Sequence, residues 1–195
     1  MMYNTEGRLP YLDPKQLTPE QKSFYDANVQ AMQPMPYVWM TPDKKLNGPT
    51  NVMLYEVEIG NMLFPLNRAT IKTSIDRVGG AAHEIAILVT VSSVKAHYGM
   101  YAHTQLARKF GVTDDQISAV MNGQKPADLD AKAAAAYDLA SALCQTGAIP
   151  GSVYDKCVSV LGQDGFNALV LAIGMFKLIG TILNAYNEPV PEYRG

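Results

Sequence analysis

A glutamate and all three histidines of the 195-residue chain lie within one short segment. They are His83, Glu84, His97 and His103. Imidazole titrates near pH 6.5, so it can both accept and donate a proton at neutral pH. A carboxylate partner can orient the ring and stabilise its charged form. The segment therefore predicts proton transfer, with His103 as the acid/base. Glu84 either orients His103 or is itself the base, and His83 is the histidine least expected to react.

Glu84 and His103 can meet only if the segment between them is not one straight helix. Nineteen residues of continuous helix would separate them by about 28 Å. The run VTVSSVK (89–95) has low helix propensity, and serine is a good cap for a new helix. We therefore expect a break near Ser92-Ser93, after which a second helix folds back and brings Glu84 toward His103.

The start of that second helix offers groups for binding a negatively charged substrate. Lys95 and His97 would lie in its first turn, where backbone N–H groups favour an anion. Tyr98 follows them in the same turn. Each residue also has a structural alternative. Lys95 would then be a solvated surface lysine, His97 would pack against Tyr101, and Tyr98 would be a core residue.

The face of the second helix that carries His103 is otherwise made of small residues. Ala96, Gly99 and Ala107 lie three or four residues apart on that face. They leave space that either another helix or a ligand fills, so a packed core histidine and an active-site histidine both remain open. A metal is not expected, because the histidines are spaced by fourteen and six residues rather than by a zinc-binding motif.

The composition is that of an ordinary globular domain. It is 48% hydrophobic and 17% charged, with a net charge of −2 and no run of basic residues, so we expect no nucleic-acid partner. The first residues do not resemble a secretory signal, and no apolar run is long enough to span a membrane. We therefore expect a cytoplasmic protein with no membrane contact, in which Cys144 and Cys157 are reduced thiols.

The pattern of helix starts and stops predicts an all-α fold of about seven to eight helices. A short helix from Thr18-Pro19 to about Met32 lies within an N-terminal arm, residues 1–49, which Tyr37 and Trp39 pin to the body. A helical domain follows over 50–192, and 193–195 form a tail. Within the domain we expect these features: a helix over 51–74 kinked or split at Pro65, a connector over 76–80, the broken segment 82–110, a capped helix from Thr113, a helix from Asp130, a short helix over 150–161 and a long helix over 164–187.

The spacing of Glu84, Ala96, Gly99 and His103 resembles that of the carboxymuconolactone decarboxylase and alkylhydroperoxidase-D-like family. The stretches 83–112 and 173–192 carry the resemblance, which covers residues 50–192. The peroxidase branch of the family has a Cys-x-x-Cys pair where this chain has Ala96 and Gly99. Because the thiolate is the reacting species in that branch, peroxidase activity is not expected.

The resemblance to the branch without cysteines implies an alkylhydroperoxidase-D-like fold and a homo-oligomer, a trimer or hexamer. It implies a cofactor-free enzyme that decarboxylates or isomerises a small carboxylated cyclic substrate. His103 and Glu84 would move protons, while Tyr98, Lys95 and His97 would hold the substrate. The first alternative is a non-catalytic member that binds a small molecule, and the second is an alkylhydroperoxidase-type antioxidant.

Overall fold

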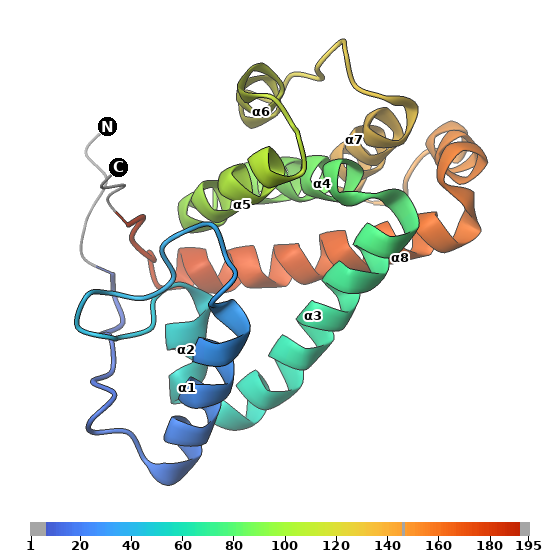
Figure 1. The fold of residues 1–195 in the computed structure, drawn as a ribbon. Helices are drawn as coiled ribbons and strands as arrows, with labels where there is room; N and C mark the ends of the chain where they lie inside the picture. Colours follow the sequence, from blue (N-terminus) through green and yellow to red (C-terminus); the bar gives the residue numbers. More distant parts are fainter. Residues whose placement is uncertain (1–6, 146, 192–195) are drawn as a thin grey trace.

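The computed structural model describes residues 7–145 and 147–191, which form eight α-helices and no strand beyond an isolated bridge between Met40 and Leu46. The predicted all-α fold of seven to eight helices is confirmed (Figure 1). The predicted tail over 193–195 lies outside the described residues. The helices are α1 Pro19–Met32, α2 Pro49–Tyr55, α3 Val57–Val78, α4 Gly80–Ser93, α5 His97–Lys109, α6 Asp114–Met121, α7 Ala131–Leu143 and α8 Gly151–Ala185.

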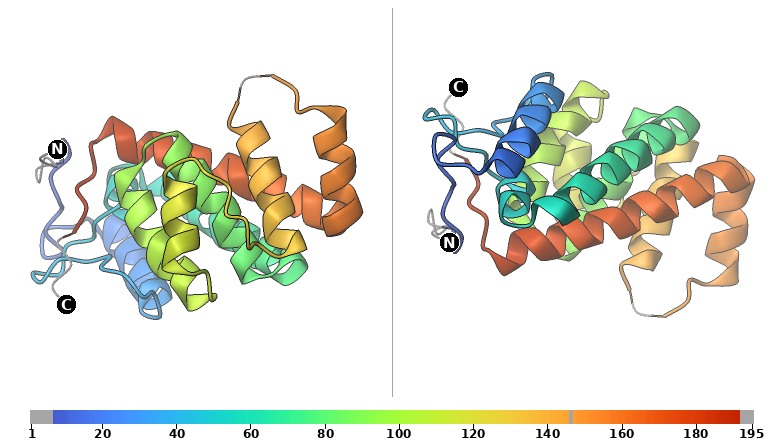
Figure 2. Two further views of the ribbon diagram at one scale, coloured as in Figure 1. Left: turned by 90° about the horizontal axis from the view of Figure 1, so that it is seen from above. Right: turned by 90° about the horizontal axis from the view of Figure 1, so that it is seen from below.

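The longest helix, α8, runs along the molecule, and α3, α4 and α7 pack against it (Figures 1 and 2). Its first part is set off from the rest by Gly162, whose φ of 70° is not helical. The two helices expected over 150–161 and 164–187 are thus both present and meet at this glycine. By length and composition α8 is the one described helix that would span a membrane. More than half of its most apolar stretch is buried against the neighbouring helices, which accounts for its hydropathy.

Helix α4 occupies the centre of the fold and contacts α3, α5, α6, α7 and α8. All ten residues from Ala82 to Val91 are buried. A helix that is surrounded on every side needs apolar residues all round rather than on one stripe. The two charged or titratable residues in this stretch, His83 and Glu84, therefore lie inside the core, where each needs a specific partner.

The predicted break between the two helices of the histidine segment is confirmed, but its cause differs from the prediction. Helix α4 ends at Ser93, and α5 begins at His97. No serine caps α5, because Ser93 donates its hydroxyl back to the carbonyl of Thr90. The chain instead reverses at Lys95, whose φ is 54°. A left-handed residue of this kind ends a helix without any side-chain cap.

The predicted split at Pro65 is wrong, and the predicted connector over 76–80 is reduced to Gly79, which alone separates α3 from α4. Helix α3 continues through Pro65 to Val78, and the chain bends instead at Glu56, before α3 begins. Leu63 and Phe64 beside the proline are buried in the cluster formed with α1 and α2. Their burial holds the helix despite the roughly 3 kcal/mol that an internal proline costs.

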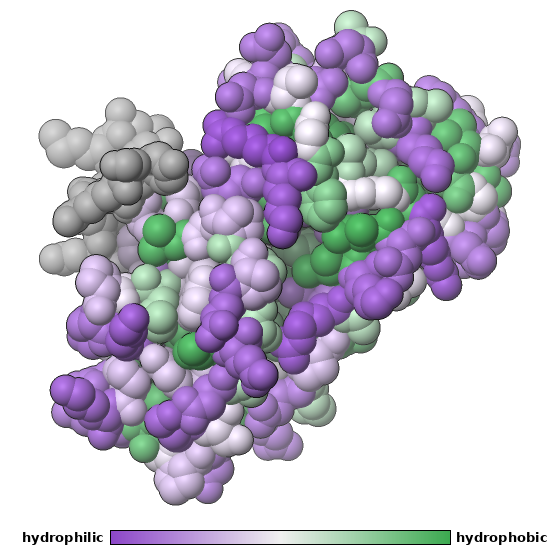
Figure 3. All heavy atoms as spheres, viewed as in Figure 1, coloured by the Kyte–Doolittle hydropathy of each residue, from purple (hydrophilic) through white to green (hydrophobic). Residues whose placement is uncertain are grey.

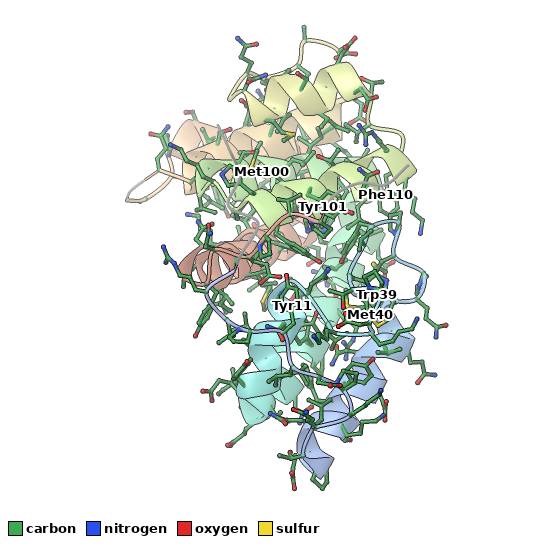
Figure 4. The ribbon with its side chains drawn as sticks, turned by 90° about the vertical axis from the view of Figure 1, so that its left-hand side faces the viewer. Tyr11, Trp39, Met40, Met100, Tyr101 and Phe110 are labelled. Carbon is green, nitrogen blue, oxygen red and sulfur yellow. The ribbon has the colours of Figure 1, made fainter. Side chains whose placement is uncertain are left out.

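The N-terminal arm is attached to the body at several points. Glu188 accepts hydrogen bonds from the Gly48 N–H and the Tyr11 hydroxyl. The hydroxyl of Tyr101 accepts a hydrogen bond from the Val38 N–H. Figure 4 shows Trp39 and Met40 together in the arm loop, which Figure 1 places between α1 and α5.

The arm helix expected from Thr18-Pro19 to about Met32 is confirmed as α1, which begins with a capping box. Trp39 packs into the hydrophobic cluster of α1, α2 and α3, and Tyr37 packs against the cluster that contains α5, as the pinning prediction requires. The division of the chain at residue 50 stays a prediction.

Two glycines of α8 predict opposite effects of the same substitution. A Cβ at the buried Gly180 would lie 2.8 Å from a methyl of Val94 in the α4–α5 connector, whereas a Cβ at the exposed Gly174 would meet nothing within 4 Å. We expect Gly180→Ala to lower the free energy of unfolding by about 1 kcal/mol, because overpacking outweighs the gain in helix propensity. Gly174→Ala should raise it by about 0.5–1 kcal/mol. Urea denaturation measures both, and equal effects would show that Val94 moves aside freely.

Candidate active site

The α4–α5 reversal brings Glu84 and His103 into direct contact. His103 Nδ1 lies 2.8 Å from Glu84 Oε2, and both residues are buried. An ionised carboxylate only accepts hydrogen bonds, so Nδ1 carries the proton that it donates. The neutral ring then presents the lone pair of Nε2, which is the atom that can act as a base. Glu84 is only 2% exposed, so its carboxylate lies inside the core and not at the surface.

His83 lies on the other side of the same carboxylate. Its Nδ1 is 2.9 Å from the Ser74 hydroxyl, and its Nε2 is 4.0 Å from Glu84 Oε1, with no hydrogen-bond partner. Burial lowers the pKa of His83 to about 4, although the charge of Glu84 acts in the opposite direction. His83 is therefore a neutral imidazole at physiological pH.

These three side chains form part of the wall of a cavity of about 340 Å³. The rest of its lining is mostly apolar and comes from the arm, α1, α3, α5 and α8. His103 and His83 both meet Phe176 of α8 edge-on, with ring centroids 4.6 and 6.4 Å apart. Figure 3 shows a recess above α3 in which hydrophobic residues are visible among hydrophilic ones. Helix α1 contributes Asn28, Ala31 and Met32 to the lining, the arm loop contributes Met35 and Tyr37, and α2 contributes Pro49 and Thr50.

Positive side chains border the cavity at exposed positions. Arg68 and Lys72 come from α3 and Lys109 comes from the end of α5. Lys72 also forms an ion pair with Asp76. Cations at the edge of an apolar cavity attract a negatively charged ligand and leave the deeper part for its uncharged portion.

The structure does not bring Lys95 and His97 to this cavity. Both residues are exposed, and neither lines it. The reversal at Lys95 is the reason, because it leaves these two residues at the surface end of α5 while His103 lies further along the helix. His97 does lie in the first turn of α5 as expected, but away from the cavity, and the expectation that Lys95 lies in that turn is wrong because Lys95 belongs to the connector.

Tyr98 reaches the cavity with its ring but uses its hydroxyl elsewhere. The hydroxyl donates to Asn47 Oδ1 at 2.9 Å, and the ring packs on Gly48, where a Cβ would lie 2.6 Å from it. Burial raises the pKa of Tyr98, so the hydroxyl keeps its proton. The geometry thus supports the structural alternative, in which Tyr98 holds the arm rather than the substrate.

The space expected beside His103 is shared between a ligand cavity and a neighbouring helix. Gly99 and Ala102 line the cavity. Ala96 is fully buried against Gly180 of α8. Ala96, which stands where the peroxidase branch has its first cysteine, is therefore packed against a helix. Gly99, which stands where that branch has its second cysteine, lines the cavity.

Neither cysteine is placed to supply the missing thiol. Cys144 and Cys157 are both free, as expected, and neither lines the cavity of His103. Cys157 is buried and donates to the carbonyl of Ala135, and burial raises the pKa of its thiol. In residues 7–145 and 147–191 no three His, Cys, Asp or Glu side chains are grouped so as to hold a metal ion.

Sequence reasoning missed the arm as a wall of the cavity and underrated His83. No spacing pattern could have assigned the apolar arm residues to the site. For His83 the sequence did contain a signal. It lies next to Glu84 in a helix that is apolar on all sides, and such a helix is buried together with its few polar residues.

Residues 76–142 match the sequence profile of the carboxymuconolactone decarboxylase family. The matched segment runs from the end of α3 to α7 and contains Glu84 and His103. Over this segment, the resemblance inferred from the glutamate and histidine spacing is confirmed. No curated protein and no solved structure matches the chain significantly.

The depressed pKa of His83 predicts a pH-dependent loss of stability. The pKa is about 4 in the folded protein and near 6.5 in the unfolded chain, so the unfolded chain binds the proton more tightly. The contribution of His83 is complete above pH 6.5 and is lost as the pH falls toward 4, by about 3 kcal/mol in total. In urea denaturation, the stability advantage of wild type over His83→Gln should shrink by about this amount between pH 7 and pH 4. An NMR titration of the ring checks the assignment directly, and a midpoint near 6.5 would contradict it.

Proposed function

We propose that this protein is a cofactor-free acid/base enzyme that decarboxylates or isomerises a small carboxylated cyclic substrate. The observation that carries the proposal is the 2.8 Å hydrogen bond between His103 Nδ1 and Glu84 Oε2 in the wall of a 340 Å³ cavity. A histidine held in one tautomer by a buried carboxylate, beside space for a ligand, is arranged for proton transfer.

In an isomerisation, His103 Nε2 removes a proton from a carbon next to a carbonyl group of the substrate. The C–H electron pair moves into a new double bond, and negative charge collects on the carbonyl oxygen. The imidazolium returns the proton at another carbon of the conjugated system, which shifts the double bond. Glu84 stabilises the imidazolium between the two transfers.

In a decarboxylation, the bond between the carboxylate carbon and the ring breaks and carbon dioxide leaves. The electron pair stays with the ring and is delocalised onto a conjugated oxygen. In this reaction Nε2 of His103 first takes up a proton from solvent, and the imidazolium, which Glu84 stabilises, then gives that proton to the ring carbon and completes the product. Both reactions need one proton carrier and stabilisation of a developing oxyanion, so the same site supports either.

The cavity fits a small cyclic ligand with one charged end. Its mostly apolar wall suits a hydrocarbon ring, and Arg68 and Lys109 border it from exposed positions, where they would attract a carboxylate. These cations take over the role that the sequence assigned to Lys95 and His97.

The second candidate is a protein that binds a small molecule without converting it. The apolar lining and the use of the Tyr98 hydroxyl for the arm favour this candidate, because both are compatible with simple ligand storage. Alkylhydroperoxidase-type activity lacks a thiol near His103.

A homo-oligomer remains part of the proposal. Ile59, Met62 and Leu66 are exposed at helical spacing on α3, where a subunit contact would cover them.

The test is a combined assay of carbon dioxide release and proton exchange across carboxylated lactones and cyclic keto acids. If wild type converts one compound, His103→Gln should lower turnover by about 10²-fold or more, which is the usual contribution of a general acid/base. Glu84→Gln should also lower turnover, because the amide no longer balances the charge of the imidazolium.

Lys132→Gln on the exposed surface of α7 provides the control and should behave as wild type. The enzyme proposal is wrong if no compound reacts while wild type and His103→Gln bind the same compound equally well by calorimetry. That result would support the binding protein instead.

A further inference from the structure

The cavity wall contains buried polar atoms that the proposed proton transfer does not use. Among the described residues, three buried side-chain polar atoms lack a hydrogen-bond partner. Two of them, His83 Nε2 and Asn67 Oδ1, belong to residues that line this one cavity. Buried polar groups without a partner are rare in folded proteins, so their presence at one cavity points to a bound ligand as the missing partner.

The tautomer of His83 follows from its two neighbours. The Ser74 hydroxyl has no other acceptor among the described side chains and carbonyls, so it can donate to His83 Nδ1. The proton of the neutral ring then resides on Nε2. The carboxylate of Glu84, 4.0 Å away, favours the same arrangement, because an N–H dipole pointing toward a negative charge is more stable than a lone pair. His83 therefore presents an N–H donor at the cavity wall.

The charge of Glu84 also determines which acceptor can approach His83. A ligand carboxylate hydrogen-bonded to His83 Nε2 would lie close to Glu84 at a buried position, where like charges repel strongly. An uncharged oxygen avoids this repulsion. Partial negative charge that develops on it during reaction is balanced by the N–H group and by the proton newly taken up on His103.

We propose that His83 Nε2–H binds an uncharged carbonyl oxygen of the substrate, a ketone or lactone, while any carboxylate of the substrate lies toward Arg68 and Lys109. This inference rests on the proposed function and deepens it by assigning the group that receives the oxyanion. His83 and His103 both contact Phe176 and both face Glu84, so one small molecule can meet the two imidazoles together. A neutral imidazole can polarise a carbonyl in this way without giving up its proton.

The test uses three probes with the same ring system: 2-tetralone, tetralin and tetralin-2-carboxylate. Calorimetry measures their affinities, and isotope-edited infrared spectroscopy measures the stretch of the labelled carbonyl of bound 2-tetralone. We expect wild type to bind the ketone more tightly than tetralin and to lower its stretching frequency relative to an apolar solvent. His83→Leu should weaken ketone binding by about 3- to 10-fold, as expected for one neutral hydrogen bond, and should abolish the frequency shift.

His83→Gln serves as the matched variant, because its amide can place an N–H group near the position of Nε2, so part of the frequency shift should return. Tetralin, which has no oxygen, should bind wild type and His83→Leu alike. If His83→Leu does not fold, Ser74→Ala tests the same point, since losing the hydroxyl that fixes the tautomer should reduce the shift.

Equal ketone affinity and an unchanged carbonyl frequency in wild type and His83→Leu would overturn the inference and would mean that Nε2 binds only water. A carboxylate probe whose affinity depends on His83 would overturn the assignment of an uncharged oxygen. Neither readout requires turnover, so the inference can fail while His103→Gln still abolishes catalysis. Equally, the carbonyl shift can be present in a protein that does no chemistry.

Discussion

The structure depends on one buried carboxylate. Glu84 lies in α4, within a run of ten consecutive buried residues, where an ionised group without partners would cost several kcal/mol. The direct partner is His103, and it can reach Glu84 only because the chain reverses between α4 and α5. The connector that makes this reversal packs closely on α8, where Gly180 leaves room for Val94 and Ala96. The packing of the central helices and the contact between Glu84 and His103 therefore depend on each other.

The two histidines beside Glu84 differ because their surroundings differ. His83 is completely enclosed, bound to a serine hydroxyl, and too far from Glu84 for a hydrogen bond, so burial dominates and the ring is neutral. His103 makes the short charge-assisted hydrogen bond and borders the cavity. One carboxylate thus has a direct donor on one side and a neutral N–H group on the other. A site with these two functions can move a proton and stabilise the oxygen that receives the electrons.

Much of this arrangement could be predicted from local sequence signals. The N-cap and proline at Thr18-Pro19 and the capping box at Thr113 indicated two helix starts, and weak helix propensity over 89–95 indicated the reversal that joins Glu84 to His103. The predictions that were wrong or incomplete concern positions whose structure is determined by tertiary packing and not by the local sequence. Helix α3 continues through Pro65 because the buried neighbours of the proline hold the helix. Lys95 was expected inside the new helix, but the left-handed conformation that it adopts has no reliable signal in a lysine. The arm residues in the cavity wall carry only an apolar signal, which any core residue shares.

The segment that matches the family profile forms only part of the cavity wall. The residues proposed to transfer protons therefore lie inside the segment, and many of the residues that shape the cavity lie outside it. Residues 76–142 supply Glu84, His103 and His83, but most of the wall facing them comes from the arm, α1, α3 and α8. The arm is tied to the chain's other end through Glu188 and to α5 through Asn47 and Val38. Substitutions in the arm would therefore change the shape of the cavity without touching the proton carrier. The shape of the cavity is therefore determined mainly by residues outside the segment that matches the family profile.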